Sequence, residues 1–198
     1  MPSLSKRPVR DVRVASLQVT VDRRENGVIY VRSPQPLGEY PARVTDRLEL
    51  WAAQAPSRIF LADRVSDGKW RIVTYGEALA RVRRLARGLL DRGLSADRPL
   101  MILSGNSIEH GLLALGAMYA GIPYAPIASA YSLAVKEFTA LAHVWQNFGP
   151  AMVYADEGAR FAPALKAVSQ GDTEIVFHSS SPEGMRSISF VELEDSKS

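Results

Sequence analysis

The sequence contains no cysteine. Disulfides, zinc sites built from thiolates and cysteine nucleophiles are therefore excluded, which suits an intracellular protein. Long apolar runs are also missing: the basic N-terminus lacks the apolar core of a secretory signal, and the apolar stretch 111–130 is broken by Gly121, Pro123 and Pro126. We therefore expect a cytoplasmic protein that does not act at a membrane.

An excess of charge of one sign is missing as well. The 198 residues carry 24 Lys and Arg against 21 Asp and Glu, a net charge of +3, and the two signs are mostly interspersed. This balance does not favour a nucleic-acid partner. One predicted helix and its end carry five arginines: Arg81, Arg83, Arg84, Arg87 and Arg92. Because Glu77, Asp91 and Asp97 lie close in sequence, we interpret these arginines as a solvated helix face rather than a polyanion site.

A glycine-rich phosphate loop is the third absence. Neither GxxxxGK[ST] nor a GxGxxG that follows a strand occurs in the sequence. The segment Ser104-Gly105-Asn106-Ser107 does lie between a predicted strand and a predicted helix, where open α/β sheets receive ligands. Since it has a single glycine, we interpret it first as a turn with a helix N-cap, and second as an anion site.

The stretch from Val73 to Ile127 carries the clearest pattern. Thr74 and Glu77 have the spacing of a capping box, and the helix that follows should close at Gly93. Strands are predicted at about 100–104 and 123–127, joined by a helix that ends at Gly121. Two strands joined by one helix imply a right-handed crossover and parallel pairing.

The remaining elements follow from the same signals. A strand at 28–32, a helix capped by Thr45, and a hairpin of 59–64 with 70–73 precede this stretch. Ser132 should cap a helix over 133–148, with a strand at 151–155, a helix at 157–169 and a strand at 174–177 after it. A partly alternating pattern of apolar residues predicts an edge strand within residues 1–26. These residues are Val12, Val14, Leu17, Val19 and Val21.

Helices and strands alternate after residue 74. This predicts an α/β fold with a mostly parallel sheet flanked by helices, in which the strands at 100–104, 123–127, 151–155 and 174–177 belong to one sheet. We expect residues 1–40 to form an N-terminal extension with short strands and residues 41–198 to form the α/β domain.

Two segments of this region resemble a known family. Thr74-Tyr75-Gly76-Glu77-Ala78-Leu79 resembles the (L)TYxEL motif, and the segment AGIPYAPI at 120–127 resembles the AGxxYxPI motif, of the adenylate-forming acyl-CoA synthetases. Three further segments are similar to feruloyl-CoA synthetases: YVRSPQPL at 30–37, TDRL at 45–48 and SGNSIEH at 104–110. The resemblance extends over most of the chain, roughly 28–176.

The resemblance implies an activity that the chain alone does not complete. Such enzymes use ATP and magnesium to convert an aromatic acid, here a hydroxycinnamate, to an acyl adenylate, and then transfer the acyl group to CoA. The family's Thr/Ser/Gly-rich loop for ATP and its later motifs are absent from these 198 residues. The resemblance therefore implies the N-terminal subdomain of a longer ligase, truncated before the ATP phosphate loop, inactive alone and without a catalytic residue of its own.

One loop of the chain matches a CoA site of the family by position. Ser129, Ala130, Tyr131 and Ser132 match the loop beside the CoA nucleotide in CoA-using relatives. Where relatives have an arginine in the next helix, this sequence has Lys136 but no arginine between 133 and 148. The alternative is an ordinary loop with a helix N-cap.

Three histidines complete the candidate chemistry. His110, His143 and His178 have no second histidine or acid at metal-binding spacing, so we predict no metal site, and Glu109 is interpreted as a first-turn helix charge. Two rival functions stay open: a self-contained flavodoxin-like binding module that uses the SGNS turn, and another adenylate-former such as a fatty-acyl-CoA ligase or a carrier-protein loading enzyme. If the chain is a truncated ligase, we also expect self-association through the face left uncovered by truncation.

Overall fold

The computed structural model describes residues 18–65, 67–169 and 173–195, and it divides the chain into two compact units, 1–40 and 41–198. The first unit holds one antiparallel hairpin, β1 (Thr20–Arg23) with β2 (Ile29–Arg32), turned at Gly27 with φ +82°. The strand predicted at 28–32 is confirmed. Of the edge strand predicted in 1–26, Val12, Val14 and Leu17 lie outside the described residues, whereas Val21 lies in β1.

The second unit begins with a helix and a hairpin. Helix α1 (Asp46–Gln54) precedes β3 (Ile59–Arg64) and β4 (Trp70–Thr74), which pair antiparallel as predicted. The prediction that Thr45 caps α1 through its side chain is wrong. Thr45 has helical φ and ψ, its hydroxyl is buried without a hydrogen bond, and Asp46 instead accepts from the Arg43 amide at 3.0 Å.

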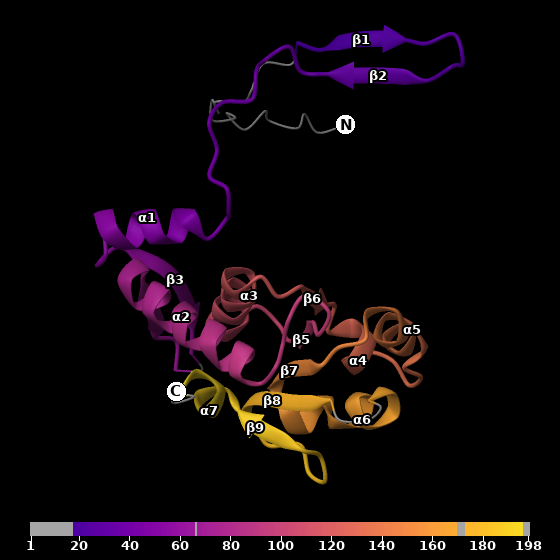
Figure 1. The fold of residues 1–198 in the computed structure, drawn as a ribbon. Coiled ribbons are helices and arrows are strands. Elements are labelled where there is room, and N and C mark those ends of the chain that lie inside the picture. The colour runs from indigo at the N-terminus through magenta and orange to yellow at the C-terminus, as the bar shows by residue number, and fades with distance from the viewer. Residues whose placement is uncertain (1–17, 66, 170–172, 196–198) are drawn as a thin grey trace, which may run out of the picture. The chain divides into compact units, whose positions relative to one another are not determined.

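A parallel five-stranded sheet follows, in the order β6-β5-β7-β8-β9 (Figure 1). Its strands are β5 (Leu100–Leu103), β6 (Tyr124–Ile127), β7 (Met152–Glu157), β8 (Glu174–Ser179) and β9 (Ser187–Ser189). Its helices are α2 (Tyr75–Asp91), α3 (Ile108–Ala120), α4 (Ala130–Leu133), α5 (Thr139–Phe148), α6 (Gly158–Val168) and α7 (Phe190–Glu194). The predicted fold class and the parallel pairing of the four predicted strands are confirmed.

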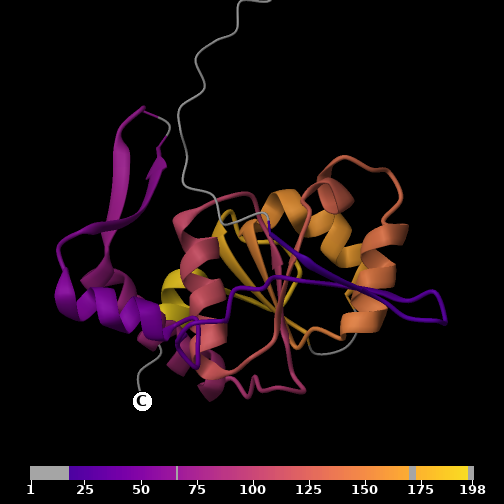
Figure 2. The same cartoon turned by 90° about the horizontal axis from the view of Figure 1, so that it is seen from above.

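Helices pack on both faces of this sheet (Figure 2). Successive strand residues point to opposite faces, so Leu100 and Ile102 pack against α2, α3 and α7, whereas Met101 and Leu103 pack against α5 and α6. Both sets are fully buried, which explains why the strands read as continuous apolar runs rather than alternating ones.

The predicted start of α2 and the predicted ends of α2, α3 and α5 agree with the structure, whereas the predicted start of the helix at 133 does not. The capping box of Thr74 and Glu77 is present at the start of α2, and Gly93, Gly121 and Gly149 have positive φ after α2, α3 and α5. The single helix predicted over 133–148 is wrong, because the chain leaves helical geometry after Leu133 and starts α5 only at Thr139.

The edge strand β6 contains the second proline of the AGIPYAPI segment. Leu100 donates its amide to the Pro123 carbonyl, so residues 123, 125 and 127 face β5 and Pro126 faces the open edge. A proline there removes the outward N–H that a further strand would need. Among the described residues, no helix is long and apolar enough to cross a membrane.

Candidate functional site

The carboxyl edge of the sheet carries most of the candidate chemistry. The strand order places β5 between β6 and β7, so the order in which the chain adds strands across the sheet reverses at β5, the position where open α/β sheets bind ligands. The loop 104–107 follows β5 directly, Asp156 lies near the end of β7, and the loop 128–132 follows β6. Parallel pairing brings all three segments to one edge.

One amide of the 104–107 loop and two at the α3 start already have acceptors. Gly105 donates its amide to Asp156 Oδ2 at 2.9 Å, His110 donates to Ser107 Oγ at 3.1 Å, and Ile108 donates to Asp63 Oδ2 at 3.4 Å. Two of these acceptors are carboxylates, which fill the place that a phosphate would take at a helix start. The geometry therefore supports the turn with an N-cap, with Ser107 as the cap, over an anion site.

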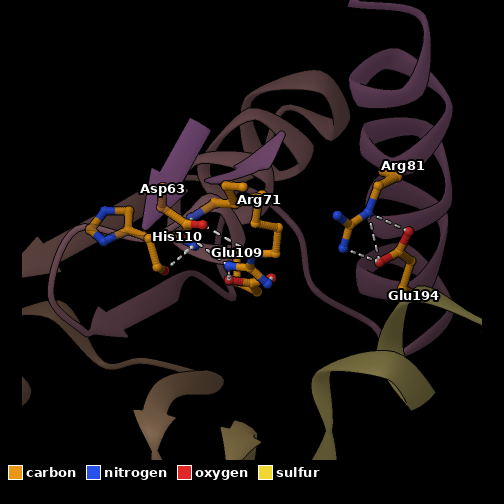
Figure 3. A network of polar contacts seen from close by, with 8 residues as sticks. Asp63, Arg71, Arg81, Glu109, His110 and Glu194 are labelled. Carbon is orange, nitrogen blue, oxygen red and sulfur yellow. Dashed lines mark hydrogen bonds and ion pairs between the residues drawn. The ribbon is translucent and has the colours of Figure 1, made fainter. Parts of the chain in front are cut away.

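A partly buried ion cluster, in which only Glu109 is fully buried, lies next to this loop. The Arg71 guanidinium lies between the carboxylates of Asp63 and Glu109, with its shortest contact to each at 2.6 Å (Figure 3). Hydrogen bonds from Arg71 hold the pKa of Asp63 below its ordinary value. Glu109 does lie in the first turn of α3, as the sequence indicated, but it is only 2% exposed and pairs with Arg71. The cluster joins the β3–β4 hairpin to the first turn of α3.

Sequence reasoning missed this cluster because its partners are far apart in the chain. Arg71 is 38 residues from Glu109, and neither residue has a spacing that marks a pair. The alternation of β3 and β4 was the one available signal, since Asp63 and Arg71 occupy opposite positions of the predicted hairpin.

The arginines of the α2 region also form ion pairs. Arg81 donates through Nε to the Glu194 carboxylate of α7 at 2.9 Å (Figure 3). Arg84 contacts the same carboxylate. Arg92 donates to Glu174 at 2.8 Å. The interpretation as a solvated face is wrong for Arg81 and Arg92, whose side chains are mostly buried at these contacts. Because carboxylates of the chain occupy these guanidinium groups, the contacts give no support to a polyanion site.

The predicted CoA loop lies at the same edge of the sheet. Ser129 stands before α4 without a side-chain cap, and Tyr131 is exposed. The prediction that Ser132 caps a helix is wrong, since Ser132 lies inside α4, is buried, and its hydroxyl has no hydrogen bond within the described chain. Ala130 opens α4, and Lys136 lies exposed in the connection to α5. The four residues are thus contiguous on one turn, but none of the described residues engages the Ser132 hydroxyl.

The three histidines lie in different settings. His110 Nδ1 lies 2.7 Å from Ser104 Oγ, His143 contacts Asn147 one turn along α5, and His178 stacks edge-on against Phe190 at 6.2 Å between ring centroids. Across the described ranges, no three His, Asp or Glu side chains gather closely enough to hold a metal ion.

Comparison with known proteins places these elements in one family of enzymes. The model of the AMP-binding enzyme family matches residues 48–196. Surfactin synthase subunit 2 of Bacillus subtilis is 34% identical over 85 residues, which cover 43% of this chain and 2% of that protein. A probable nonribosomal peptide synthetase of Salinispora arenicola, CymA, is 32% identical over 91 residues, which cover 46% of this chain and 1% of that one.

Solved structures share the fold at lower identity. A putative long-chain-fatty-acid CoA ligase from Rhodopseudomonas palustris superposes with a TM-score of 0.60 at 24% identity, covering 78% of this chain and 37% of that one. A benzoate CoA ligase from Burkholderia xenovorans gives 0.56 at 20%, covering 76% and 28%. The N-terminal subdomain of NpsA from Klebsiella oxytoca gives 0.55 at 18%, covering 79% and 33%. The chain thus spans well under half the length of the proteins it resembles.

Proposed function

The chain belongs to the AMP-binding enzyme family, and from this premise we propose that it forms the N-terminal subdomain of an AMP-forming acid:CoA ligase. In the proposed reaction, a carboxylate oxygen of the acid attacks the α-phosphorus of ATP, with magnesium, and pyrophosphate leaves. The CoA thiol then attacks the acyl carbonyl, and AMP leaves. The first step is needed because a carboxylate is a poor acyl donor, whereas AMP is a good leaving group.

The observation that carries the proposal is the match of the family model over three quarters of the chain. The geometry adds a consistent detail: the TYGEAL segment begins α2 with a capping box, and the AGIPYAPI segment closes α3 at Gly121 and forms β6. The two motif segments thus form the beginning and the end of one continuous helix-strand-helix-strand unit. An isolated motif match would not require that arrangement.

For the acid, we propose a hydroxycinnamate such as ferulate. The support is the resemblance of the segments at 30–37, 45–48 and 104–110 to feruloyl-CoA synthetases. The relatives named above act on different acids by their titles, including long-chain fatty acids and benzoate. The acid is therefore a separate question from the reaction type, and the assay must treat the two independently.

For CoA, we propose that Ser129, Ala130, Tyr131 and Ser132 line the nucleotide site. The exposed Tyr131 ring offers a stacking surface, and the Ser132 hydroxyl is a hydrogen-bonding group that the described chain leaves unused. Lys136 is the cation nearest to this loop in sequence.

The test is acid-dependent ATP–pyrophosphate exchange by the complete gene product. Ferulate, cinnamate, benzoate and palmitate are compared, and CoA is then compared with a phosphopantetheinyl carrier protein as the acyl acceptor. Exchange with ferulate and thioester formation on CoA support the proposal. Exchange that requires an amino acid, followed by loading of the carrier, would favour the alternative of a carrier-protein loading enzyme. The 198-residue chain alone should release no pyrophosphate.

We also propose that the isolated chain self-associates. Helices cover both faces of the five-stranded sheet, but the outer face of the β3–β4 hairpin exposes Trp70 at 57% and Ile72 at 47%. Exposed apolar area of this kind favours association. Light scattering over a concentration series should show a rising mean mass, and Trp70→Ser should reduce it. A strictly monomeric wild-type chain at high concentration would refute this expectation.

A further inference from the structure

His110 forms a compact polar triangle with the end of β5. Its Nδ1 lies 2.7 Å from Ser104 Oγ and 3.2 Å from the Gly105 carbonyl oxygen, and Ser104 Oγ lies 3.0 Å from that same oxygen. Ser104 is buried, so solvent does not separate these atoms. All three pairs are within hydrogen-bonding distance, and this restricts where the protons can be.

Counting protons selects one arrangement. The Gly105 carbonyl only accepts, and the Ser104 hydroxyl has one proton. If Nδ1 carried no proton, Ser104 could donate its one hydroxyl proton either to Nδ1 or to the Gly105 carbonyl, but not to both. The contact without the proton would then bring two lone pairs together. If Nδ1 carries a proton, His110 donates to Ser104 Oγ and Ser104 donates to Gly105, so both contacts are satisfied. The ring is therefore held with its proton on Nδ1.

The other ring nitrogen is open. In the described residues Nε2 has no hydrogen-bond partner, and it is not among the buried polar atoms that lack one, so it is reachable from solvent. A neutral imidazole with its proton on Nδ1 presents Nε2 as an acceptor. A hydrogen bond that fixes one ring nitrogen and leaves the other open is the arrangement that orients metal-binding histidines, and it orients this ring in the same way.

The open nitrogen Nε2 belongs to a residue at the carboxyl edge of the sheet. His110 lies in the first turn of α3, beside β5, where the strand order reverses and where α/β sheets receive ligands. We propose that His110 is a ligand-binding residue whose Nε2 accepts a hydrogen bond from a hydroxyl group of a bound small molecule. The inference rests on the proposed function for the source of that hydroxyl, either the ribose of ATP or the phenol of a hydroxycinnamate.

The first experiment tests the tautomer without any ligand. The chain has only three histidines, so nitrogen NMR of the imidazole rings at pH 8.5 can be assigned by comparison with His143→Gln and His178→Gln variants. We expect the His110 proton on Nδ1, and a mixture of tautomers at the exposed His178. A proton on Nε2 of His110 would overturn the inference.

The second experiment separates the two nitrogens by substitution. In His110→Asn the side-chain amide nitrogen takes the place of Nδ1 and keeps the inner hydrogen bonds, but nothing reaches the position of Nε2. In His110→Gln the longer side chain reaches that position and gives up the inner bonds. A purely structural role predicts an asparagine variant that binds ligands normally. The proposal predicts that His110→Asn folds normally and binds the hydroxylated ligand about three- to tenfold more weakly, the effect of one hydrogen bond.

Binding is measured by NMR titration with four probes: ferulate, cinnamate, ATP and 2′,3′-dideoxy-ATP. Ferulate moving Nε2 when cinnamate does not identifies a phenol, and ATP moving it when the dideoxy nucleotide does not identifies a ribose. A probe that binds and shifts other residues while leaving Nε2 unchanged refutes the inference and leaves the proposed function intact. If no probe binds the chain at millimolar concentration, the inference fails, whereas the proposed function is tested separately by the exchange assay on the complete gene product.

Discussion

The two loops at the carboxyl edge of the sheet differ in how completely they satisfy their own polar groups. In the loop 104–107, the Gly105 amide and the Ser107 hydroxyl both have partners within the chain. The loop 128–132 forms only backbone turns, and the Ser132 hydroxyl has no partner in the described residues. The sequence of the first loop is the more suggestive of ligand binding. The second contains a buried hydroxyl without a partner in the described residues, so polar composition alone does not identify a site.

The largest expected effect comes from the ion cluster behind the first loop. Arg71→Met leaves the Glu109 carboxylate buried without its cation, a change that costs about 3 kcal/mol in buried ion pairs. The free energy of unfolding, measured in urea at pH 7, should fall by that amount. Arg87→Met is the matched control, because its pair with Asp91 is exposed and its loss should stay within about 0.5 kcal/mol. Equal losses in both variants would mean that Glu109 is not buried as described.

Acid should weaken the same cluster. Arg71 lowers the folded-state pKa of Asp63 below 3.8, so this contact stabilises the protein fully above the unfolded-state pKa and is lost as pH falls through the folded value. Burial alone would raise the pKa of Glu194, but its pairs with Arg81 and Arg84 outweigh burial and lower it, so it acts in the same direction. The free energy of unfolding should be level between about pH 6 and 5 and should fall below about pH 4.

Asp63→Asn provides the check on that pH dependence. The variant lacks the carboxylate, so its deficit relative to wild type should be greatest near neutral pH and should shrink as the pH falls below about 4. Urea unfolding of both proteins across the pH range measures the difference. A deficit that stays constant with pH would show that the contribution of Asp63 does not depend on its charge.

The sequence predicted the fold well because local signals and burial agree there. Capping by Thr74 and the glycines that end α2, α3 and α5 are local features. The fully buried runs of β5 and β7 favour strands of a parallel sheet covered on both faces. The break between α4 and α5 was missed because residues 134–138 carry no proline or glycine to mark it. Helix propensity is a weak prior at such a position, and tertiary packing overrides it.

The site was predicted less well because its chemistry depends on contacts between distant residues. Asp156, 51 residues away in sequence, accepts the hydrogen bond of the Gly105 amide. Arg71 pairs with the buried Glu109 carboxylate. Neither contact has a sequence spacing that identifies it. His110 was discounted for lack of a second ligand at metal spacing, a criterion that does not detect a histidine oriented by a serine and a carbonyl.

The smallest effect gives the sharpest contrast between the two loops. Ser107→Ala removes the hydroxyl that accepts from the His110 amide and should cost about 1 kcal/mol. Ser132→Ala removes a buried hydroxyl that has no partner, so the free energy of unfolding should stay unchanged or rise slightly. Thermal unfolding of the two variants measures the difference in stability loss. Both substitutions remove one serine hydroxyl, so the comparison is direct.

The same pair of variants also separates stability from function. If CoA binding exposes and engages the buried Ser132 hydroxyl, Ser132→Ala should weaken CoA binding about three- to tenfold while leaving the melting temperature intact, because the hydroxyl gains a partner only in the complex. Ser107→Ala should do the reverse, lowering the melting temperature and leaving CoA affinity unchanged. A stability loss in Ser132→Ala as large as that in Ser107→Ala would mean that the chain itself engages the Ser132 hydroxyl. The polar groups of the loop 128–132 would then have partners within the chain, as those of the loop 104–107 do. The reason for assigning CoA to the loop 128–132 would be lost.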